Sequence, residues 1–300
     1  MDFKQLSRSE INEVKWNACI EHSDYVHAYG TTWYLDTVCP NGWEALVWGD
    51  YDAVMPLPRG KILFYKQTFT PFWIQQLGLF KKSGVQIEVE PFHQFLENTF
   101  RLLDLCVFDA SDFADKTIYE SRVNYEWLLT ENHQKDYSKN LKRQLKKAKE
   151  QKLQLATSTD ISSLIQFFRA HKGAVISDYQ TYDYDRLEQL IQGDIANGRG
   201  VVLSAEKDGI VVGMAYYQIA MGRATYLLGT SNDAGRSCGA MQFLMDSFVS
   251  EWKHKITLLD FEGSAILGLQ QFYKSFGAQP KKYFRIKINR LPFPLNWMKK

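Results

Sequence analysis

The chain has 300 residues, roughly two domains' worth, and its apolar fraction of 45% is too high for a disordered protein. Its formal net charge of +2 argues neither for nor against a polyanionic partner. The four cysteines form no C-x-x-C pair, the first residues lack the apolar core of a signal peptide, and no apolar run approaches the roughly 18 residues that span a bilayer. We therefore expect a cytoplasmic protein without a disulfide framework, a metal site or a membrane span.

Hydrophobic periodicity and turn residues predict alternating helices and strands in the first half. The capping-box pattern Ser7-x-x-Glu10 opens the first helix, whose apolar stripe would hold Val14, Trp16 and Ala18. Further helices are expected at residues 31–38 and 92–103. Strands are expected at residues 43–48, 52–57, 62–69, 105–108 and 125–129. Pro56 and Pro58 mark a strand end, because proline cannot donate a hydrogen bond to the ladder.

The second half begins with a basic helix from Tyr137 to about Lys152. Residues 135–152 contain eight lysines and arginines against Asp136 and Glu150, and the helix has one apolar seam. Further helices are expected at residues 161–171, with Asp160 as N-cap, and at 184–197, 240–253 and 265–276. Strands are expected at residues 153–157, 201–206, 210–220, 224–229, 256–261 and 283–289, and Asp208-Gly209 predicts a hairpin turn.

Both halves show the same coarse order of helices, an antiparallel strand meander, a helix and a strand. We therefore predict a duplicated α/β fold in which each half has a central, mostly antiparallel sheet flanked by helices. The predicted domains are residues 1–134 and 135–300.

Small residues predict a loop at residues 230–239, directly before a helix. Backbone amides at such a helix start bind phosphate without side-chain help, and Arg236 would add a charge-assisted contact. The candidate cofactor-binding residues are Gly229, Ser231, Gly235, Arg236, Ser237, Gly239 and Ala240. The alternative is an ordinary helix N-terminus capped by Ser237 or Asn232.

Several motifs in this order resemble the GNAT acyltransferase superfamily, and the whole chain resembles its FemAB-like branch with two GNAT-type domains in tandem. Residues Arg236–Met241 resemble the pyrophosphate turn Q/R-x-x-G-x-G/A, although Met241 replaces the final small residue. Leu269–Ala278 resembles the helix ends A-x-x-L-Y-x-x-x-G-F and F-K-x-x-F-G. Leu259–Gly263 resembles the strand end D-F-G-G, with Glu262 in place of a glycine. In the first half, Val54–Leu57 and residues 70–78 look like the first Fem-type domain.

The resemblance implies catalytic roles for two neighbouring side chains. Tyr273 falls where these enzymes often place the general acid for the leaving group, and a tyrosine stays protonated at neutral pH. Lys274 falls where the Fem-type lysine supports the donor carbonyl. A core tyrosine and a solvated helix lysine are the structural alternatives.

Two carboxylates end the strand beside the gap that the fold would open. Asp260 or Glu262 could deprotonate an ammonium acceptor directly or through water. The alternative is that Ser264 or Glu262 simply caps the following helix.

The first half lacks a tight small-residue turn, so we expect it to be degenerate for cofactor binding. Phe72, Trp73 and Gln75 are candidate wall residues of an acceptor site, or else packing residues. The basic helix, including Arg143, could attract tRNA, the 3′-phosphate of a nucleotide cofactor or an anionic acceptor, or could be a solvated face.

Together these features predict a bacterial-type N-acyltransferase that uses acyl-CoA, such as acetyl-CoA, and a small-molecule or peptide amine. The first alternative is a Fem-like aminoacyl transferase that uses aminoacyl-tRNA to extend a peptide or cell-wall precursor. The second is an inactive GNAT scaffold, which the degenerate Met241 position would permit.

Overall fold

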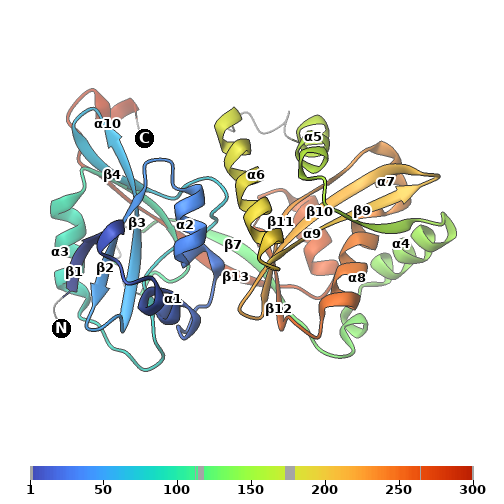
Figure 1. The fold of residues 1–300 in the computed structure, drawn as a ribbon, viewed down its shortest axis with the longest axis horizontal. Helices are drawn as coiled ribbons and strands as arrows, with labels where there is room; N and C mark the ends of the chain where they lie inside the picture. The colour runs from blue at the N-terminus through green and yellow to red at the C-terminus, as the bar shows by residue number, and fades with distance from the viewer. Residues whose placement is uncertain (1–2, 112, 114–117, 173–179, 264, 299–300) are drawn as a thin grey trace. The chain divides into compact units, whose positions relative to one another are not determined.

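The computed structural model describes residues 3–111, 113, 118–172, 180–263 and 265–298. Its contacts group the chain into two compact units, one with residues 1–123 and 282–300 and the other with residues 124–281. Figure 1 shows the elements of both units along the chain. The sequence-based boundary at residue 134 stays a prediction. None of the described helices has both the length and the apolar character needed to cross a bilayer.

The first unit contains a mostly antiparallel sheet with the strand order β1-β2-β3-β4-β6-β13, in which β4 and β6 are parallel and the short β5 also pairs with β3. Its helices are α1 (Glu13–Glu21), α2 (Thr32–Val38), α3 (Val89–Thr99) and α10 (Leu295–Met298). Its strands are β1 (Phe3–Ser7), β2 (Trp43–Trp48), β3 (Ala53–Ile62), β4 (Tyr65–Phe69), β5 (Phe80–Lys81), β6 (Leu102–Val107) and most of β13 (Gln279–Asn289).

Helices cover both faces of this sheet. Side chains alternate between the faces of a strand, and on β2 the Trp43 ring lies 5.0 Å from Trp16 of α1, whereas the Trp48 ring lies 5.5 Å from Phe92 of α3. All four rings are buried. Aromatic residues of the first half therefore pack between the sheet and the helices on each of its two faces.

The expected strand end at Pro56 and Pro58 is wrong, because β3 continues to Ile62. The Arg59 amide donates to the Gly42 carbonyl, 2.9 Å away, on the β2 side. By alternation, the nitrogens of both prolines face away from β2. On that side, within the described residues, β3 pairs at residues 53–54 and 59–62 alone, so neither proline removes a ladder bond.

The second unit contains the strand order β7-β12-β11-β10-β9-β8, again with one parallel pair, β11 and β12. Its strands are β7 (Ile118–Leu128, from residue 124), β8 (Gln154–Ser158), β9 (Gly200–Lys207), β10 (Ile210–Ala220), β11 (Arg223–Ser231) and β12 (Leu258–Gly263). Its helices are α4 (Lys139–Glu150), α5 (Ile161–His171), α6 (Thr181–Ala196), α7 (Asp233–Cys238), α8 (Ala240–Trp252) and α9 (Leu267–Ser275).

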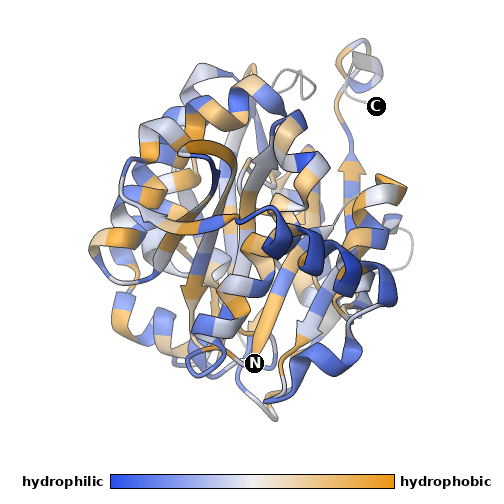
Figure 2. Cartoon of the chain, turned by 90° about the vertical axis from the view of Figure 1, so that its right-hand side faces the viewer, coloured by the Kyte–Doolittle hydropathy of each residue, from blue (hydrophilic) through white to orange (hydrophobic). Residues whose placement is uncertain are grey.

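Two adjacent tyrosines of β10 show which helices cover which face. The Tyr216 hydroxyl donates to Asp194 of α6 at 2.7 Å, whereas the Tyr217 ring stacks on Phe248 of α8 at 3.8 Å. The helices α6 and α8 therefore lie on opposite faces of the sheet. Figure 2 shows apolar colouring on the strands of this unit and strongly hydrophilic colouring on α4.

The expected α/β fold with mostly antiparallel, helix-flanked sheets is confirmed. The bounds of α5 and β10, the Asp160 cap and the hairpin turn also match the sequence, and Asp208 and Gly209 both have the positive φ that such a turn requires. The capping box at Ser7 forms, but on a single 3₁₀ turn, and α1 starts later with Asn12 as its cap.

The loop expected at residues 230–239 is wrong in its secondary structure. Residues 233–238 form α7, whose cap Asn232 accepts the Gly235 amide at 2.8 Å. Gly239 then adopts a left-handed conformation, with φ of 75°, and α8 begins at Ala240. The small residues of this segment allow a helix to lie close to the sheet. In the sequence, such a run of small residues looks the same as a loop.

Gly235 is required by the close approach of α7 to β10. A Cβ atom at this position would lie 2.0 Å from the Val212 carbonyl oxygen. We expect Gly235→Ala to lower the free energy of unfolding by about 1–3 kcal/mol, measured by urea denaturation. The matched control is Gly193→Ala in α6, where an added Cβ meets nothing within 4 Å and helix propensity should raise stability by up to about 1 kcal/mol. Equal effects of the two substitutions would contradict this assignment.

Asp194 gives the second unit a pH-dependent stability. Burial raises the pKa of this carboxyl from 3.8 to about 6, partly offset by hydrogen bonds from Tyr216 and Arg199. The native state therefore binds the proton more tightly than the unfolded chain does, so the stabilising effect is present at low pH and is lost as the pH rises through about 6. Relative to Asp194→Asn, the wild type should lose on the order of 3 kcal/mol of unfolding free energy between about pH 4 and pH 7. A difference that stays flat across this range would show that the carboxyl titrates normally.

Candidate functional site

The parallel strands β11 and β12 part in the middle of the second unit. Their register holds only at residues 223–225 of β11 and 258–260 of β12, ending at Thr225 opposite Asp260. Beyond this point β11 continues to Ser231 beside β10, whereas β12 follows β7. Among the described residues, no strand pairs with the β12-facing edge of β11 after Thr225. That edge is free to bond an extended ligand that carries amide groups.

A β-bulge lies directly beyond the last paired residues. On β11, Tyr226 pairs with Tyr217 and Leu228 pairs with Tyr216, so Leu227 is an extra residue. A bulge increases the local twist of a strand and bends it. The distortion turns β11 away from β12 and helps to keep the gap open.

A buried ion-pair cluster closes the base of the gap. Arg223 Nη1 donates to Asp260 Oδ2 at 2.6 Å and to Glu126 Oε1 at 2.9 Å. Asp260 Oδ1 accepts from Asn124 Nδ2 at 3.0 Å and from the Glu262 amide at 2.8 Å. Asp260 is fully buried and held by three donors, so it is better suited to fixing β7, β11 and β12 than to exchanging protons.

Two polar side chains lie in register with Asp260 on the same face of the sheet. Thr225 pairs across β11 and β12 with Asp260, and Gln218 pairs with Thr225. Among the described residues, Thr225 Oγ1 and Gln218 Nε2 are buried without a hydrogen-bond partner. An unsatisfied buried polar atom costs about 1–3 kcal/mol, and such atoms gather where a ligand supplies the partner.

Glu262 sits in a strained position at the mouth of the gap. Residues 261 and 262 form a bulge opposite β7, and Glu262 has φ of 55°. This is the left-handed position that glycine occupies in G1 bulges and that resembles the glycine of the D-F-G-G motif. Burial lowers the pKa of Lys172, the residue that directly follows α5, and the charge of Glu262 partly offsets this fall.

Tyr273 of α9 faces the gap from the α8 side of the sheet. Its ring lies 4.8 Å from Phe261 and 5.8 Å from Tyr125, and the residue is 4% exposed. Burial raises its pKa above the usual value near 10, and the charges of Glu262 and Asp260 add to the shift. Among the described residues, its hydroxyl makes no hydrogen bond, so a protonated phenol stands ready to donate.

Lys274 points elsewhere. Its ammonium lies 5.6 Å from the centre of the Tyr125 ring, and its side chain lines a surface pocket of about 580 Å³ with Glu126, Asp136 and Gly277. The structure thus brings Asp260, Glu262 and Tyr273 into one electrostatic group and leaves Lys274 beside it.

The expected phosphate-binding residues divide into buried and exposed sets. Ser231, Gly235, Gly239 and Ala240 are buried, whereas Arg236 and Ser237 are exposed. The Gly235 amide is used by Asn232, and the Gly239 amide donates to the Gly235 carbonyl. Among the described residues, no side chain caps the start of α8, and the amides of residues 240–242 have no backbone partner there, although Ala240 is itself buried. Gly229 lies further back, in β11, above the Tyr226 hydroxyl.

Arg236 lies in α7 and contacts residues at the start of that helix. One of its Nη atoms donates to the Ser231 carbonyl at 2.8 Å and the other bonds Asp233, whose side chain is 96% exposed. The Arg236 side chain is 58% exposed and can exchange this surface pair for a ligand phosphate at little cost.

The basic helix α4 borders a groove of about 890 Å³. Lys142, Lys146 and Lys149 line it together with Phe243 of α8. Arg143 is exposed on the same helix and bonds Asn140 at 2.8 Å. The helix therefore combines positive charge with an apolar floor, as nucleotide-binding surfaces do.

The candidate wall residues belong to the first unit. Phe72 is 42% exposed, Trp73 is buried with its carbonyl accepting the Tyr34 hydroxyl, and Gln75 bonds its neighbour Gln76 at 3.2 Å. Their role in an acceptor site stays a prediction.

The gap between β4 and β6, the counterpart in the first unit, is filled by the chain itself. The Thr70 amide donates to the Asp104 carbonyl at 3.1 Å, and the Cys106 amide donates to the Thr70 hydroxyl at 2.7 Å. The Leu77 amide then donates to the Cys106 carbonyl at 2.8 Å. The first unit's own backbone thus takes the positions that a ligand would use.

Sequence reasoning missed Arg223, Asn124, Glu126 and Lys172. Each is a common surface residue type, and their partners lie far away in the chain, so no local spacing marks them. The alternative that assigned a capping role to Ser264 lies outside the described residues. Among the described residues, no three His, Cys, Asp or Glu side chains gather into a group that could hold a metal ion.

Comparisons with known proteins identify the fold. Residues 135–275 match the family model of the acetyltransferase (GNAT) domain. No curated protein matches the sequence significantly. The structure of FemX has a TM-score of 0.64 at 12% identity, with 99% of each chain covered. The C-terminal domain assigned to a lysylphosphatidylglycerol synthetase of Agrobacterium fabrum has a TM-score of 0.61 at 14% identity, covering 94% of this chain and 93% of that one.

A third structure has the same tandem arrangement. A tandem GNAT protein from the clavulanic acid biosynthesis pathway, solved without AcCoA, has a TM-score of 0.56 at 11% identity, covering 97% of this chain and 99% of that one. The resemblance is therefore borne out at two levels: residues 135–275 match the GNAT domain model, and the solved structures share the tandem fold over nearly the whole chain.

The strain at Glu262 can be measured with two substitutions that both remove the carboxylate. Only glycine also relieves the left-handed backbone, whose cost for other residues is roughly 1–2 kcal/mol. We expect Glu262→Gly to be more stable than Glu262→Ala by about 1 kcal/mol in urea denaturation. Equal stability of the two variants would show that no strain is stored at this position.

Proposed function

We propose, because residues 135–275 match the GNAT acetyltransferase domain, that the chain is an N-acyltransferase whose second unit binds an acyl-CoA donor. The fold and the family support acyl or aminoacyl transfer in general. The observation that carries the CoA proposal is the unpaired β11 edge beyond Thr225, which leads towards the uncapped start of α8.

In this proposal the two ends of the donor use different parts of the same path. The amide-bearing arm of CoA would add to the edge of β11 as an extra strand. The pyrophosphate would lie at the amides after Gly239, with Arg236 and Ser237 as exposed partners. The thioester would then lie at the base of the gap, near Asp260 and Tyr273.

The reacting groups would act from opposite faces of the sheet. Glu262 would accept a proton from the acceptor's ammonium group, and the freed amine nitrogen would attack the thioester carbonyl. Tyr273 would give its proton to the departing thiolate sulfur as the carbon–sulfur bond breaks, and the second proton that the nitrogen loses as the amide forms would restore the Tyr273 phenol. Asp260 would be a positioning residue, which holds the base of the gap and orients the Glu262 amide. Lys274 would influence the donor through charge alone.

The amine acceptor would approach from the face that carries Gln218 and Thr225, because their unpartnered atoms offer hydrogen bonds there. The opposite face near the gap is occupied by the Phe261 and Tyr226 rings. We therefore assign donor and acceptor to the two sides of the same opening.

A Fem-like aminoacyl-tRNA transferase is the second candidate, because a specific observation favours it. The lysines of α4 border a groove large enough for nucleotides, and Phe243 provides a surface on which a base could stack. In that case the leaving group would be a ribose hydroxyl, and Tyr273 would protonate its oxygen.

Donor binding separates the two candidates. We expect acetyl-CoA to raise the melting temperature of the wild type, and Arg236→Glu to weaken acetyl-CoA binding at least tenfold in calorimetry, because the charge at the pyrophosphate is reversed. The control is Arg186→Glu in α6, where the arginine lies over Tyr182 rather than over the turn. Tight binding of aminoacyl-tRNA without any effect of acetyl-CoA would favour the second candidate instead.

Catalysis is tested by removing single hydroxyl groups. With acetyl-CoA and a panel of amines, Tyr273→Phe should lower kcat by about 10²–10⁴-fold and leave acetyl-CoA affinity unchanged, because only proton donation is lost. The control Tyr125→Phe removes a neighbouring hydroxyl that bonds Gln270 at 3.3 Å and should retain activity. Thiol release by the wild type that Tyr273→Phe and Glu262→Gln leave unchanged would contradict the assigned roles. Binding without turnover in any protein form would point to an inactive scaffold.

A further inference from the structure

The turn between β3 and β4 presents two large apolar side chains to solvent. Leu63 and Phe64 are 71% and 79% exposed and form a two-residue turn, because Ile62 pairs with Tyr65. Leu63 has φ of 56°, a conformation that hairpin turns normally assign to glycine or asparagine. The chain thus keeps apolar side chains at a position where both exposure and backbone conformation are unfavourable.

The segment that follows β13 lies at the same end of the sheet. The Arg101 amide donates to the Lys66 carbonyl at 3.3 Å, and the Arg290 amide donates to the Arg101 carbonyl at 2.8 Å. Beyond Arg290, Phe293 and Trp297 are 82% and 66% exposed.

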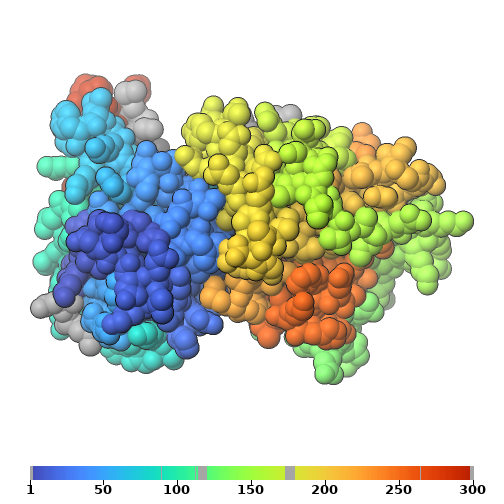
Figure 3. Space-filling model, viewed as in Figure 1, coloured from blue at the N-terminus to red at the C-terminus, as the bar shows by residue number. Residues whose placement is uncertain are grey.

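These contacts place four exposed apolar residues at one end of the first unit, and Figure 3 shows residues 59–66 and the C-terminal segment next to each other there. We call this surface the apolar end; its residues are Leu63, Phe64, Phe293 and Trp297.

Positive charge surrounds the apolar end. Lys66 lies on β4, Arg101 directly precedes β6 and Arg290 directly follows β13, where it pairs with Glu97 at 3.8 Å. Arg59 and Lys61 lie on β3. Among the described residues, Lys61, Lys66 and Arg101 have no carboxylate within ion-pair distance, whereas Arg59 pairs with Glu44 at 3.5 Å.

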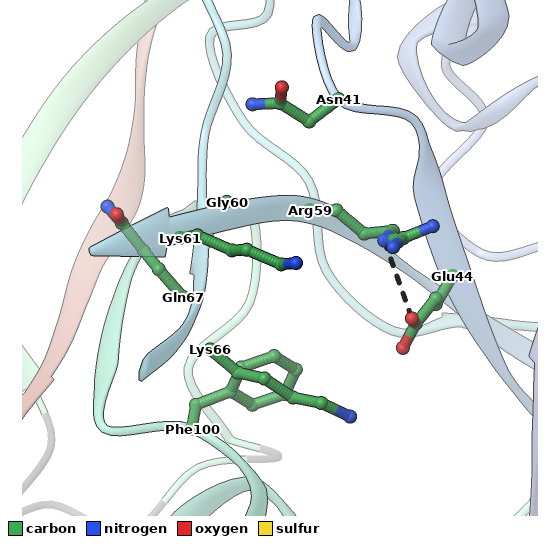
Figure 4. A pocket seen from close by; sticks show the side chains of 8 residues that line it. All are labelled: Asn41, Glu44, Arg59, Gly60, Lys61, Lys66, Gln67 and Phe100. Carbon is green, nitrogen blue, oxygen red and sulfur yellow. Dashed lines mark ion pairs between the residues drawn. The ribbon is translucent and has the colours of Figure 1, made fainter. Parts of the chain in front are cut away.

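A pocket of about 420 Å³ opens beside the hairpin. It is lined by Asn41, Glu44, Arg59, Lys61, Lys66 and Phe100 among others. Figure 4 shows the Lys61 and Lys66 side chains extending in the same direction, towards the side where Arg59 meets Glu44. A phosphate group is the chemistry that these amines and the guanidinium would recognise.

We propose that the apolar end binds an anionic membrane surface, with Leu63, Phe64, Phe293 and Trp297 entering the interface and the pocket's cations holding lipid phosphates. Apolar side chains gain free energy on leaving water for the acyl boundary, and tryptophan favours the headgroup level. Lysines and arginines next to them are attracted to anionic lipids and add to this attraction. A protein partner would match the apolar residues but gives no reason for the surrounding unpaired cations.

The test is sedimentation of the full chain with vesicles. We expect binding to phosphatidylcholine vesicles that contain phosphatidylglycerol, and at least tenfold weaker binding to pure phosphatidylcholine. The double variant Leu63→Ser/Phe64→Ser and the double variant Lys61→Glu/Lys66→Glu should each weaken binding at least tenfold, while melting temperature and acetyl-CoA binding stay unchanged. Glycerol phosphate at millimolar concentration should compete weakly, which separates a lipid surface from a free phosphate ligand.

Two matched controls localise the effect. Ile210→Ser removes an exposed apolar residue, 66% exposed, next to the β9–β10 turn, and should bind vesicles like the wild type. Lys146→Glu/Lys149→Glu reverses charge on α4 and should have little effect. The proposal is overturned if the wild type ignores anionic vesicles, if the α4 variant loses binding instead, or if the hairpin variants only convert a dimer into a monomer. Because acetyl-CoA binding is measured separately, failure here leaves the transferase proposal standing.

Discussion

The enclosed carboxylate of Asp260 determines where the central strands of the second unit separate. Its partners are Arg223 on β11, Asn124 on β7 and the amide of Glu262, so three separate segments meet at one charge. A buried ion pair often adds little net stability, because removing both charges from water costs as much as their attraction returns. The ion pair instead fixes the positions of the three segments relative to one another. Moving any of these segments would leave a charge buried without its partner.

The glycine-like position of Glu262 follows from this arrangement. The Asp260 carboxylate accepts a hydrogen bond from the Glu262 amide, and within the bulge Glu262 itself adopts the left-handed conformation. A residue kept in such a conformation against its preference is an observation that calls for a functional reason. The Glu262 carboxylate favours higher pKa values of both Tyr273 and Lys172, which come from opposite sides of the sheet, although burial lowers the pKa of Lys172 overall.

Each unit contains one parallel pair of strands that could separate, but the gap is filled in the first unit and open in the second. In the first unit, the amide and hydroxyl of Thr70 and the amide of Leu77 bond to β6 where the strands would otherwise separate. In the second, no strand in the described part of the chain pairs with the β12-facing edge of β11 beyond Thr225. The difference explains why the motif residues gather in one half of the sequence, because only an open gap leaves backbone groups for a ligand.

Much of the fold was predictable from the sequence, because its signals are local. The hairpin at Asp208-Gly209 needs only two residues with positive φ, and the bounds of α5 follow from an N-cap and an apolar period. Tertiary context decided the rest. The segment 230–239 reads as a loop from its small residues, whereas Gly235 is small because α7 lies against the β10 backbone.

The site was predictable only in part for the same reason. Tyr273, Asp260 and Glu262 stand in recognisable motifs, and the structure brings them together. The arginine that holds Asp260 comes from a strand start with no motif, and the asparagine lies 136 positions away in the chain. Spacing along a sequence carries no information about such pairs.

The order of the segments has a consequence for how the chain matures. The first unit includes residues 282–300, and β13 completes its sheet beside β6 from the far end of the sequence. During synthesis, the first unit therefore has an uncovered strand edge until β13 has been made. The second unit, whose residues 124–281 are contiguous, can become compact before then. The part of the protein made first would be the part finished last.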